Sequence, residues 1–246
     1  MKQITKIPAA IDLEKGSNDF CPGCLHSASF KIVSQTLDEM GLFDKSAYVQ
    51  GVGCCANALG YIRIDTIACP HGRGCAVAGA MKRCMPDTFI MTYQGDGDLA
   101  AIGMAETMHS ANRGDNITVI FVNNGIYGMT GGQLAPTTLL GARTTTTPFG
   151  RNANEHGYPM HMCELINTLE APSYIARVTC TDPANIRKAQ KCVRDAFQHQ
   201  LDGKGFSFVE FISNCPTNWG MTPLQSLDHI KNVVLNEYPL GVFRDK

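Results

Sequence analysis

The stretch "TYQGDGDLAAIG" (residues 92–103) places two aspartates among glycines, directly after an apolar run. That run, "TFIMTYQ" (88–94), is apolar through most of its length, which is typical of a strand buried on both faces of a parallel sheet. Asp96 and Asp98 therefore follow the carboxyl end of a buried strand, where ligands bind in α/β proteins. An acid is a poor core residue, so Asp96 is a candidate ligand-binding residue.

Strand and helix patterns alternate on both sides of this stretch, which predicts βαβ units in a mostly parallel, doubly wound α/β sheet. We expect one domain over residues 1–246, because no linker, internal repeat or low-complexity segment interrupts the chain. The expected strands are 46–53, 88–94, 117–124, 173–180 and 206–212. The expected helices are 26–41, 74–85, 99–114 with Asp98 as its N-cap, 160–171, and 183–201 opened by Asp182.

A second polar pair, Asn123 and Asn124, ends the strand "ITVIFVNN". Two successive strands thus present an acid and an amide at one edge of the sheet. A carboxylate oxygen, an amide oxygen and a nearby carbonyl are the hard ligands that Mg²⁺ prefers. Gly95 and Gly97 would let a diphosphate approach the main chain at a helix N-terminus. The alternative is a tight turn with an Asx cap.

The composition predicts a soluble globular protein: 44% of residues are apolar, 17% are charged, and the net charge is −1. Near-neutral charge argues against nucleic-acid binding. The longest apolar run, "ITVIFV", is strand-sized, so no membrane span is expected. The N-terminal residues lack an apolar signal core, so a cytoplasmic location is expected.

The chain has eleven cysteines, which is many for a cytoplasmic protein. Disulfides are rare in a reducing compartment, and an odd number of cysteines also argues against a disulfide framework. Cys21 and Cys24 have metal-ligand spacing, "GVGCC" supplies Cys54 and Cys55, and Cys215 follows a late strand. Four such thiolates bind zinc or an iron–sulfur cluster, and spacing leaves both open. A cluster would favour an anaerobic source. We interpret six others as packing residues: Cys69, Cys75, Cys84, Cys163, Cys180 and Cys192.

The motif set "GDGDLAAIG" followed by "NNGIYGMTGGQLAPTT" resembles the thiamine diphosphate signature, and from Cys21 to Cys215 the chain is similar to the β subunit of the 2-oxoacid:ferredoxin oxidoreductases. The resemblance implies a thiamine diphosphate-binding, pyrophosphate-type domain. It implies Mg²⁺ ligands at Asp96, Asn124 and the Ile126 carbonyl. It also implies cofactor contacts from Val52, Gly53, Cys54, Cys55, His71, Gly95, Gly97, Asp98, Gly128 and Met129.

The same resemblance implies one [4Fe–4S] cluster held by Cys21, Cys24, Cys54 and Cys215. Cys55 is the alternative to Cys54 as ligand, since the family more often has a small hydroxyl residue there. The resemblance also places His71 at the phosphates of thiamine diphosphate. The alternative role for His71 is to cap the helix that follows it.

The implied reaction converts a 2-oxoacid, coenzyme A and oxidised ferredoxin to acyl-CoA, CO₂ and reduced ferredoxin, with the hard step supplied by thiamine. The activating glutamate is expected from a partner α subunit with a pyrimidine-binding domain, so we assign no catalytic residue to this chain. Further γ and ferredoxin-like subunits are possible partners. Gly131 stands where 2-oxoglutarate-like relatives often have lysine, which favours 2-oxoisovalerate or another branched-chain substrate.

Three alternatives stay open at this point. The same chemistry could act on 2-oxoglutarate or pyruvate. The chain could be half of a non-redox thiamine enzyme with structural zinc, or a non-catalytic scaffold subunit that keeps the fold. The weakly periodic segment 125–159 is long for a loop, which is typical of functional segments.

Overall fold

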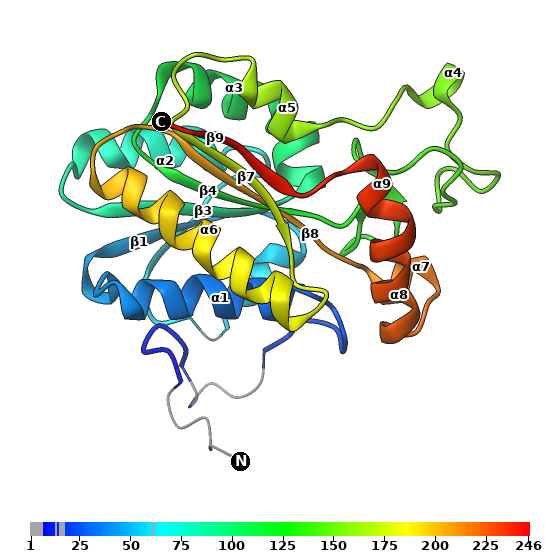
Figure 1. Cartoon of the computed structure of the whole chain (residues 1–246), viewed down its shortest axis with the longest axis horizontal. Coiled ribbons are helices and arrows are strands. Elements are labelled where there is room, and N and C mark those ends of the chain that lie inside the picture. The colour runs from blue at the N-terminus through cyan, green and yellow to red at the C-terminus, as the bar shows by residue number, and fades with distance from the viewer. Residues whose placement is uncertain (1–6, 13, 15–17, 61) are drawn as a thin grey trace.

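A seven-stranded sheet runs through the centre of the molecule (Figure 1), as seen in a computed structural model that describes residues 7–12, 14, 18–60 and 62–246. The strand order is β2-β1-β3-β4-β8-β7-β9, and all neighbours are parallel except β7 and β9. This confirms the expected mostly parallel sheet. Its strands are β1 (Ser46–Gln50), β2 (Asp65–Ala68), β3 (Phe89–Gly95), β4 (Thr118–Asn123), β7 (Tyr174–Thr179), β8 (Ser207–Ile212) and β9 (Gly241–Asp245).

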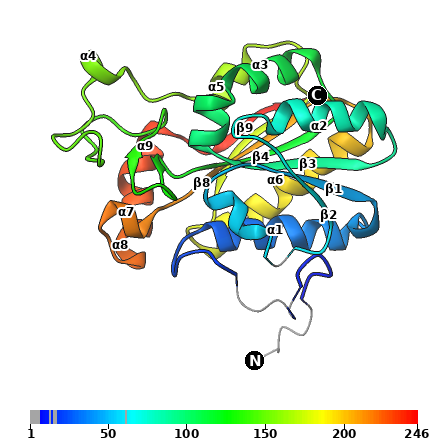
Figure 2. The same cartoon turned by 180° about the vertical axis from the view of Figure 1, so that it is seen from behind.

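Helices cover both faces of the sheet, as expected for a doubly wound fold (Figures 1 and 2). Helices α1 and α6 pack into one apolar cluster with the sheet, and α2, α3 and α5 pack into the cluster on the other face. The side chain of Asp182 caps α6 and Pro183 occupies its first turn, as predicted. These helices are α1 (His26–Glu39), α2 (Gly74–Cys84), α3 (Met104–Arg113), α5 (Met162–Asn167) and α6 (Pro183–Leu201).

The helix expected over 99–114 begins differently. The N-cap prediction for Asp98 is wrong: the Asp96 side chain accepts from the N–H of Gly97, and Gly97–Ile102 forms a π-helical segment before α3. The Gly103 N–H bonds to the Asp98 carbonyl (2.8 Å), which widens this turn. The Asp98 carboxylate is bound by other elements and is not free to cap. Such π-helical turns occur frequently at functional sites.

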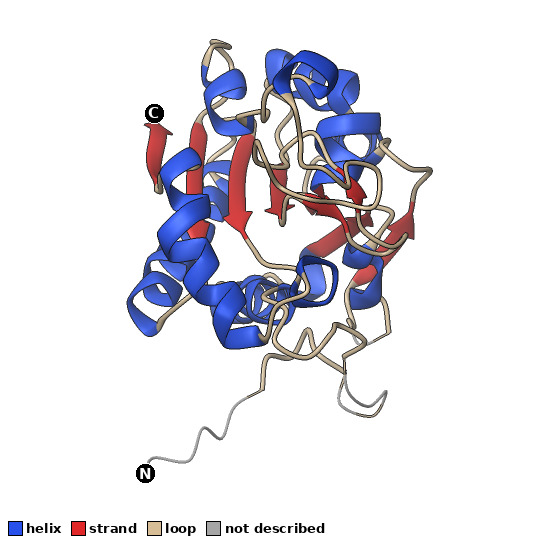
Figure 3. Ribbon diagram, turned by 90° about the vertical axis from the view of Figure 1, so that its right-hand side faces the viewer, coloured by secondary structure: helices blue, strands red, loops and turns tan. Residues whose placement is uncertain are grey.

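The segment 125–159 contains a short hairpin, β5 (Ile126–Tyr127) and β6 (Gln133–Leu134), and one turn of helix, α4 (Ala153–His156). Figure 3 views the molecule from the side on which this segment lies together with α7–α9. The sequence pattern does not predict these C-terminal elements. They are α7 (Pro216–Trp219), α8 (Pro223–His229), a π-helical segment (Ile230–Val234) and α9 (Leu235–Glu237).

Five of the six cysteines expected to pack are buried, but the prediction for Cys84 is wrong. Cys84 lies at the last position of α2 and is exposed, because the helix ends there at the surface. Within the described ranges, no helix combines the length and apolar character needed to cross a membrane.

Candidate active site

Four strand ends bring the predicted site residues together. In the sheet, β1 pairs with β3, β3 with β4, and β4 with β8, all parallel. Their carboxyl ends therefore meet at one edge, where α/β proteins bind ligands. Cys54 follows β1, Asp96 follows β3, Asn124 follows β4, and Cys215 follows β8. Parallel pairing thus gathers residues that are far apart in the sequence.

The Asp96 carboxylate is buried and held by three donors. Its Oδ1 accepts from the Gly97 N–H (2.8 Å), and its Oδ2 accepts from the Thr137 hydroxyl (2.9 Å) and the Ile126 N–H (3.2 Å). Burial nevertheless raises the pKa of Asp96 to about 6, because these hydrogen bonds only partly offset the loss of water. A bound cation would supply the missing compensation, so this acid fits a metal ligand.

The two predicted side-chain ligands of magnesium converge on one N–H group. The Ile126 N–H donates to Asp96 Oδ2 and also to Asn124 Oδ1 (3.1 Å). The Asn123 side chain is bound elsewhere: its Nδ2 donates to Oε1 of Glu210 in the neighbouring strand β8 (2.8 Å). The structure therefore brings a carboxylate oxygen and an amide oxygen together, which fits the oxygen ligands of Mg²⁺.

Removing the charge of Asp96 should stabilise the metal-free chain. A carboxyl whose pKa is raised in the folded state binds its proton more tightly than in the unfolded chain, so its stability contribution is lost as pH rises from about 4 to about 6. Allowing about 1 kcal/mol for one weakened hydrogen bond, we expect Asp96→Asn to be more stable than the wild type by about 2 kcal/mol at pH 7. Urea unfolding without Mg²⁺ between pH 4 and pH 7 measures this.

Asp115 supplies the matched control for this experiment, because its pKa is shifted the other way. Burial alone would raise the pKa of Asp115, but hydrogen bonds from Arg113, Ser110 and Arg83 outweigh it and the pKa is lowered. Asp115→Asn should therefore be destabilised at pH 7, and the deficit should shrink as the pH falls. A pH-independent effect of Asp96→Asn would contradict the raised pKa.

A cavity of about 110 Å³ lies beside the Asp96–Asn124 pair, and we call it the cofactor cavity. Every residue for which the family resemblance implied a cofactor or magnesium contact lines it. His26, Tyr127 and Thr130 also line the cavity, although no sequence motif marks them as site residues. The predicted lining residues are Val52, Gly53, Cys54, Cys55, His71, Gly95, Asp96, Gly97, Asp98, Asn124, Ile126, Gly128 and Met129.

Two glycines leave the wall of the cofactor cavity open to a ligand. A β-carbon added at Gly53 or Gly95 would find no atom within 4 Å, so a side chain there would extend into open space. Gly53 also has φ of +114°, which other residues rarely adopt. Gly97 is needed for packing instead, because a β-carbon there would overlap the ring of Tyr127. Bare backbone beside a helical N-terminus fits a diphosphate.

The Asp98 carboxylate lines the cavity but is engaged by protein groups. Its Oδ1 accepts from the Gly72 N–H (2.7 Å), and its Oδ2 accepts from Gln94 Nε2 (2.6 Å). His71 Nδ1 lies 2.5 Å from Asp98 Oδ1, although the pair does not have hydrogen-bond geometry. We therefore expect Asp98 to position the His71 turn, because an acid facing a diphosphate would repel it.

A second cavity, of about 100 Å³, lies among Cys21, Cys24, Cys54 and Cys215, and we call it the thiol cavity. A cavity needs only about 10–15 Å³ to hold one water, so this space admits a larger group. Gly128 closes one side: a β-carbon there would lie 3.1 Å from Cys54 Sγ and 3.6 Å from Cys215 Sγ. The four predicted ligands thus surround one space.

Cys54 and Cys55 differ in where they lie. Cys54 lines both cavities, whereas Cys55 lines only the cofactor cavity and is 1% exposed. Both belong to a 3₁₀-helical turn (Cys54–Ala58). Burial raises the pKa of the Cys55 thiol, with a further contribution from the charge of Asp98. The position of Cys54 favours it as the ligand.

The four thiols are not grouped around a single point. Among the residues that the structure describes, no three or more His, Cys, Asp and Glu side chains form a group that could hold a metal ion. Zinc needs four ligands about 2.0–2.3 Å from one ion, whereas a cluster spreads its four thiolates over a larger body. Burial, with a smaller contribution from neighbouring thiols, raises the pKa of Cys24 to about 12 and that of Cys54 to about 11. The space and the donor set fit a cluster.

The two cavities share a wall. His26, Cys54, Asn124 and Gly128 line both. His26 is buried, with its Nδ1 2.9 Å from the Tyr93 hydroxyl and its ring stacked on Phe20. Groups bound in the two cavities would therefore be direct neighbours.

Residues 51–211 match the family model of the C-terminal thiamine pyrophosphate-binding domain of thiamine pyrophosphate enzymes. The chain is 43% identical over 227 residues to the ketoisovalerate oxidoreductase subunit VorA of Methanothermobacter thermautotrophicus, covering 92% of this chain and 48% of that protein. It is 36% identical over 235 residues to the 2-oxoglutarate synthase subunit KorB of Archaeoglobus fulgidus, covering 91% of this chain and 82% of that protein. The chain therefore spans about half the length of the ketoisovalerate relative.

Among solved structures, the chain resembles 2-oxoglutarate:ferredoxin oxidoreductase from Magnetococcus marinus with 2-oxoglutarate, coenzyme A and succinyl-CoA bound. The TM-score is 0.83 at 25% identity, covering 100% of this chain and 87% of that chain. The glycine–aspartate turn and the asparagine pair indicate the same family as these comparisons. The chain belongs to the thiamine pyrophosphate enzyme family, among the subunits of the 2-oxoacid:ferredoxin oxidoreductases.

Proposed function

We propose that this chain is the cofactor-binding β subunit of an enzyme that converts a 2-oxoacid and coenzyme A to acyl-CoA and CO₂ while reducing ferredoxin. The observation that carries the proposal is the shared wall between the cofactor cavity and the thiol cavity. In a redox thiamine enzyme, electrons pass from the thiamine to the cluster, so the two groups must lie close together. A non-redox enzyme or a scaffold has no such requirement.

When bound, thiamine diphosphate supplies the nucleophilic carbon that attacks a 2-oxoacid, and a [4Fe–4S] cluster takes up electrons one at a time. This chain's residues hold both groups. Asp96, Asn124 and the Ile126 carbonyl bind Mg²⁺, and the glycine-lined backbone receives the diphosphate. Cys21, Cys24, Cys54 and Cys215 bind the cluster.

The active site needs a second chain. Among the described residues, no glutamate lines the cofactor cavity, yet activating thiamine requires one at its aminopyrimidine. We therefore propose an α subunit that supplies this glutamate at a shared interface, with further γ and ferredoxin-like subunits. The strands of the central sheet come from positions between Ser46 and Asp245, and of the described strands only those of the β5–β6 hairpin lie outside it, which supports a single domain over residues 1–246.

We propose 2-oxoisovalerate or another branched-chain oxoacid as substrate. The chain is 43% identical to a ketoisovalerate oxidoreductase subunit, against 36% for a 2-oxoglutarate synthase subunit. Gly131 lies in the loop beside the cofactor cavity and has no charged side chain. Its φ of +107° would strain a lysine at this position. Without a cation at position 131, a second carboxylate of the substrate would have no charged partner at this position of the loop.

Oxoacid-dependent ferredoxin reduction tests this proposal. The complex, purified without oxygen, should reduce ferredoxin with 2-oxoisovalerate and coenzyme A, at a kcat/KM about tenfold or more above that for pyruvate or 2-oxoglutarate. Omitting coenzyme A should stop acyl-CoA formation. A preference for 2-oxoglutarate would reject the substrate, and absence of any ferredoxin reduction in a thiamine-loaded complex would reject the function.

A further inference from the structure

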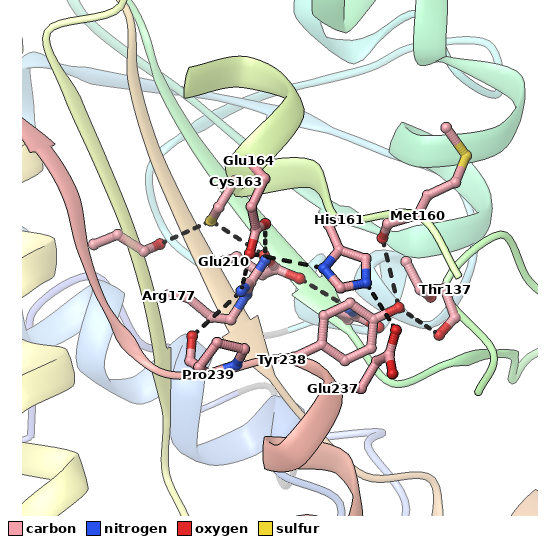
Figure 4. A network of polar contacts seen from close by, with 12 residues as sticks. Thr137, Met160, His161, Cys163, Glu164, Arg177, Glu210, Glu237, Tyr238 and Pro239 are labelled. Carbon is pink, nitrogen blue, oxygen red and sulfur yellow. Dashed lines mark hydrogen bonds and ion pairs between the residues drawn. The ribbon is translucent and has the colours of Figure 1, made fainter. Parts of the chain in front are cut away.

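A buried chain of hydrogen bonds connects the C-terminal segment to Asp96. The Tyr238 hydroxyl donates to the main-chain oxygen of Thr137 at 2.8 Å (Figure 4). The Thr137 hydroxyl in turn donates to Asp96 Oδ2 at 2.9 Å. Tyr238 is 1% exposed and Thr137 is fully buried, so water does not compete for these bonds and their geometry is fixed.

A second chain of contacts reaches the turn that carries Asn124. Glu210 accepts from Asn123 Nδ2 through Oε1 (2.8 Å) and from Arg177 Nε through Oε2 (2.8 Å). The Asn123 Oδ1 accepts from the Gly125 N–H (3.2 Å). The turn after β4 is therefore tied through its side chains to β7 and β8.

Arg177 joins the two chains of contacts (Figure 4). Its guanidinium donates to the Pro239 carbonyl (3.2 Å) and lies 5.3 Å from the centroid of the Tyr238 ring. Glu164 accepts from both terminal nitrogens of this guanidinium. Arg177 and Glu210 are fully buried. The Tyr238 ring is therefore held against a fixed charge network, which directs its hydroxyl to Thr137.

From this arrangement we propose that Thr137 and Tyr238 are positioning residues for the magnesium site. Thr137 fixes the orientation of the Asp96 carboxylate, and Tyr238 fixes Thr137. The inference rests on the proposed function, since it takes Asp96 to be a magnesium ligand. Groups that hydrogen-bond to a metal ligand typically contribute about 10–100-fold to metal affinity.

Thr137→Val and Thr137→Ser test the hydroxyl directly. The full chain is titrated with Mg²⁺ at a fixed concentration of thiamine diphosphate. Trp219, the single tryptophan, lines a cavity of about 200 Å³ with Asn123 and Asn124 and provides the fluorescence signal. Thr137→Val should weaken the apparent Mg²⁺ affinity about 10–100-fold. Thr137→Ser keeps the donor and should stay within about threefold of the wild type.

Tyr238→Phe tests the connection to the C-terminal segment, because it removes one hydroxyl and keeps the ring beside Arg177. It should weaken Mg²⁺ affinity about tenfold or less. Tyr158, which is 72% exposed, supplies the control: Tyr158→Phe should change nothing. Thermal unfolding of each variant without ligand separates a loss of stability from a loss of metal binding.

Two outcomes separate this inference from the proposed function. If Thr137→Val binds Mg²⁺ as the wild type does, or if Thr137→Ser fails to restore the affinity, the positioning role is overturned. If the wild type binds magnesium and thiamine diphosphate but its complex reduces no ferredoxin, the proposed function is rejected while the affinities still decide the role of Thr137.

Discussion

Replacing Asp96 by alanine is expected to abolish magnesium-dependent binding of thiamine diphosphate while leaving the iron content unchanged. Asp96 is the carboxylate that shares the Ile126 N–H with Asn124, and it lies in the cofactor cavity but not in the thiol cavity. Losing a group that only supports a metal ligand costs about 10–100-fold, so losing the ligand itself should cost more than about 100-fold.

The measurement is thiamine and iron content after anaerobic gel filtration with Mg²⁺ and thiamine diphosphate. Asp87 provides the control, since it is exposed and precedes the same strand, β3, at its other end. Asp87→Ala should retain both cofactors. Thiamine retained by Asp96→Ala at the wild-type level would show that this aspartate is not the metal ligand.

Cys54→Ala should lose the cluster, and Cys55→Ala should keep it. Cys54 lines both the thiol cavity and the cofactor cavity, whereas Cys55 lines only the cofactor cavity. Three thiolates hold a cubane less firmly than four, so the iron content of Cys54→Ala should fall to a small or labile fraction. Adjacent residues of the same type make this a matched pair.

Iron analysis and visible absorbance before and after reduction measure this difference, with Cys215→Ala expected to behave like Cys54→Ala. The reverse pattern, with iron lost in Cys55→Ala and kept in Cys54→Ala, would exchange the two assignments. Zinc in place of iron in the wild-type chain would favour the non-redox alternative.

The sequence predicted the part of the site that depends on strand ends. Asp96 and Asn124 follow buried strands that are adjacent both in the sequence and in the sheet, so the parallel topology alone places them at one edge. Only the family resemblance assigns the four cysteines to one common site. Their spacing does not show that the segment before α1 reaches the end of β8, where the Asn214 side chain bonds the Leu25 N–H (2.9 Å).

The sequence did not predict contacts made between distant elements. Thr137 and Tyr238 are separated by 101 residues and have no motif of their own, so their bond emerges only from the folded chain. The N-cap prediction for Asp98 failed for a related reason. An Asp before an apolar run is a good local cap, but Gly72 and Gln94 come from other elements and compete for that carboxylate.

The C-terminal region also escaped prediction. Helix α7 spans a single turn. The helical run from Pro223 to Glu237 contains the π-helical segment Ile230–Val234, which interrupts the 3.6-residue period by which a helix is predicted from sequence. Strand β9 is an exposed edge strand that pairs antiparallel with β7. Tyr238, which follows α9, nevertheless connects this region to Asp96 through Thr137.

In the function that we propose, a magnesium site and an iron–sulfur cluster are direct neighbours within this chain. Mn²⁺, which takes the same oxygen ligands as Mg²⁺, is paramagnetic, so electron paramagnetic resonance of the reduced cluster reports its proximity. With Mn²⁺ and thiamine diphosphate bound, the cluster signal should relax faster than with Mg²⁺, and Asp96→Ala should remove the effect. A cluster signal that is identical with bound Mn²⁺ and bound Mg²⁺ would contradict the claim.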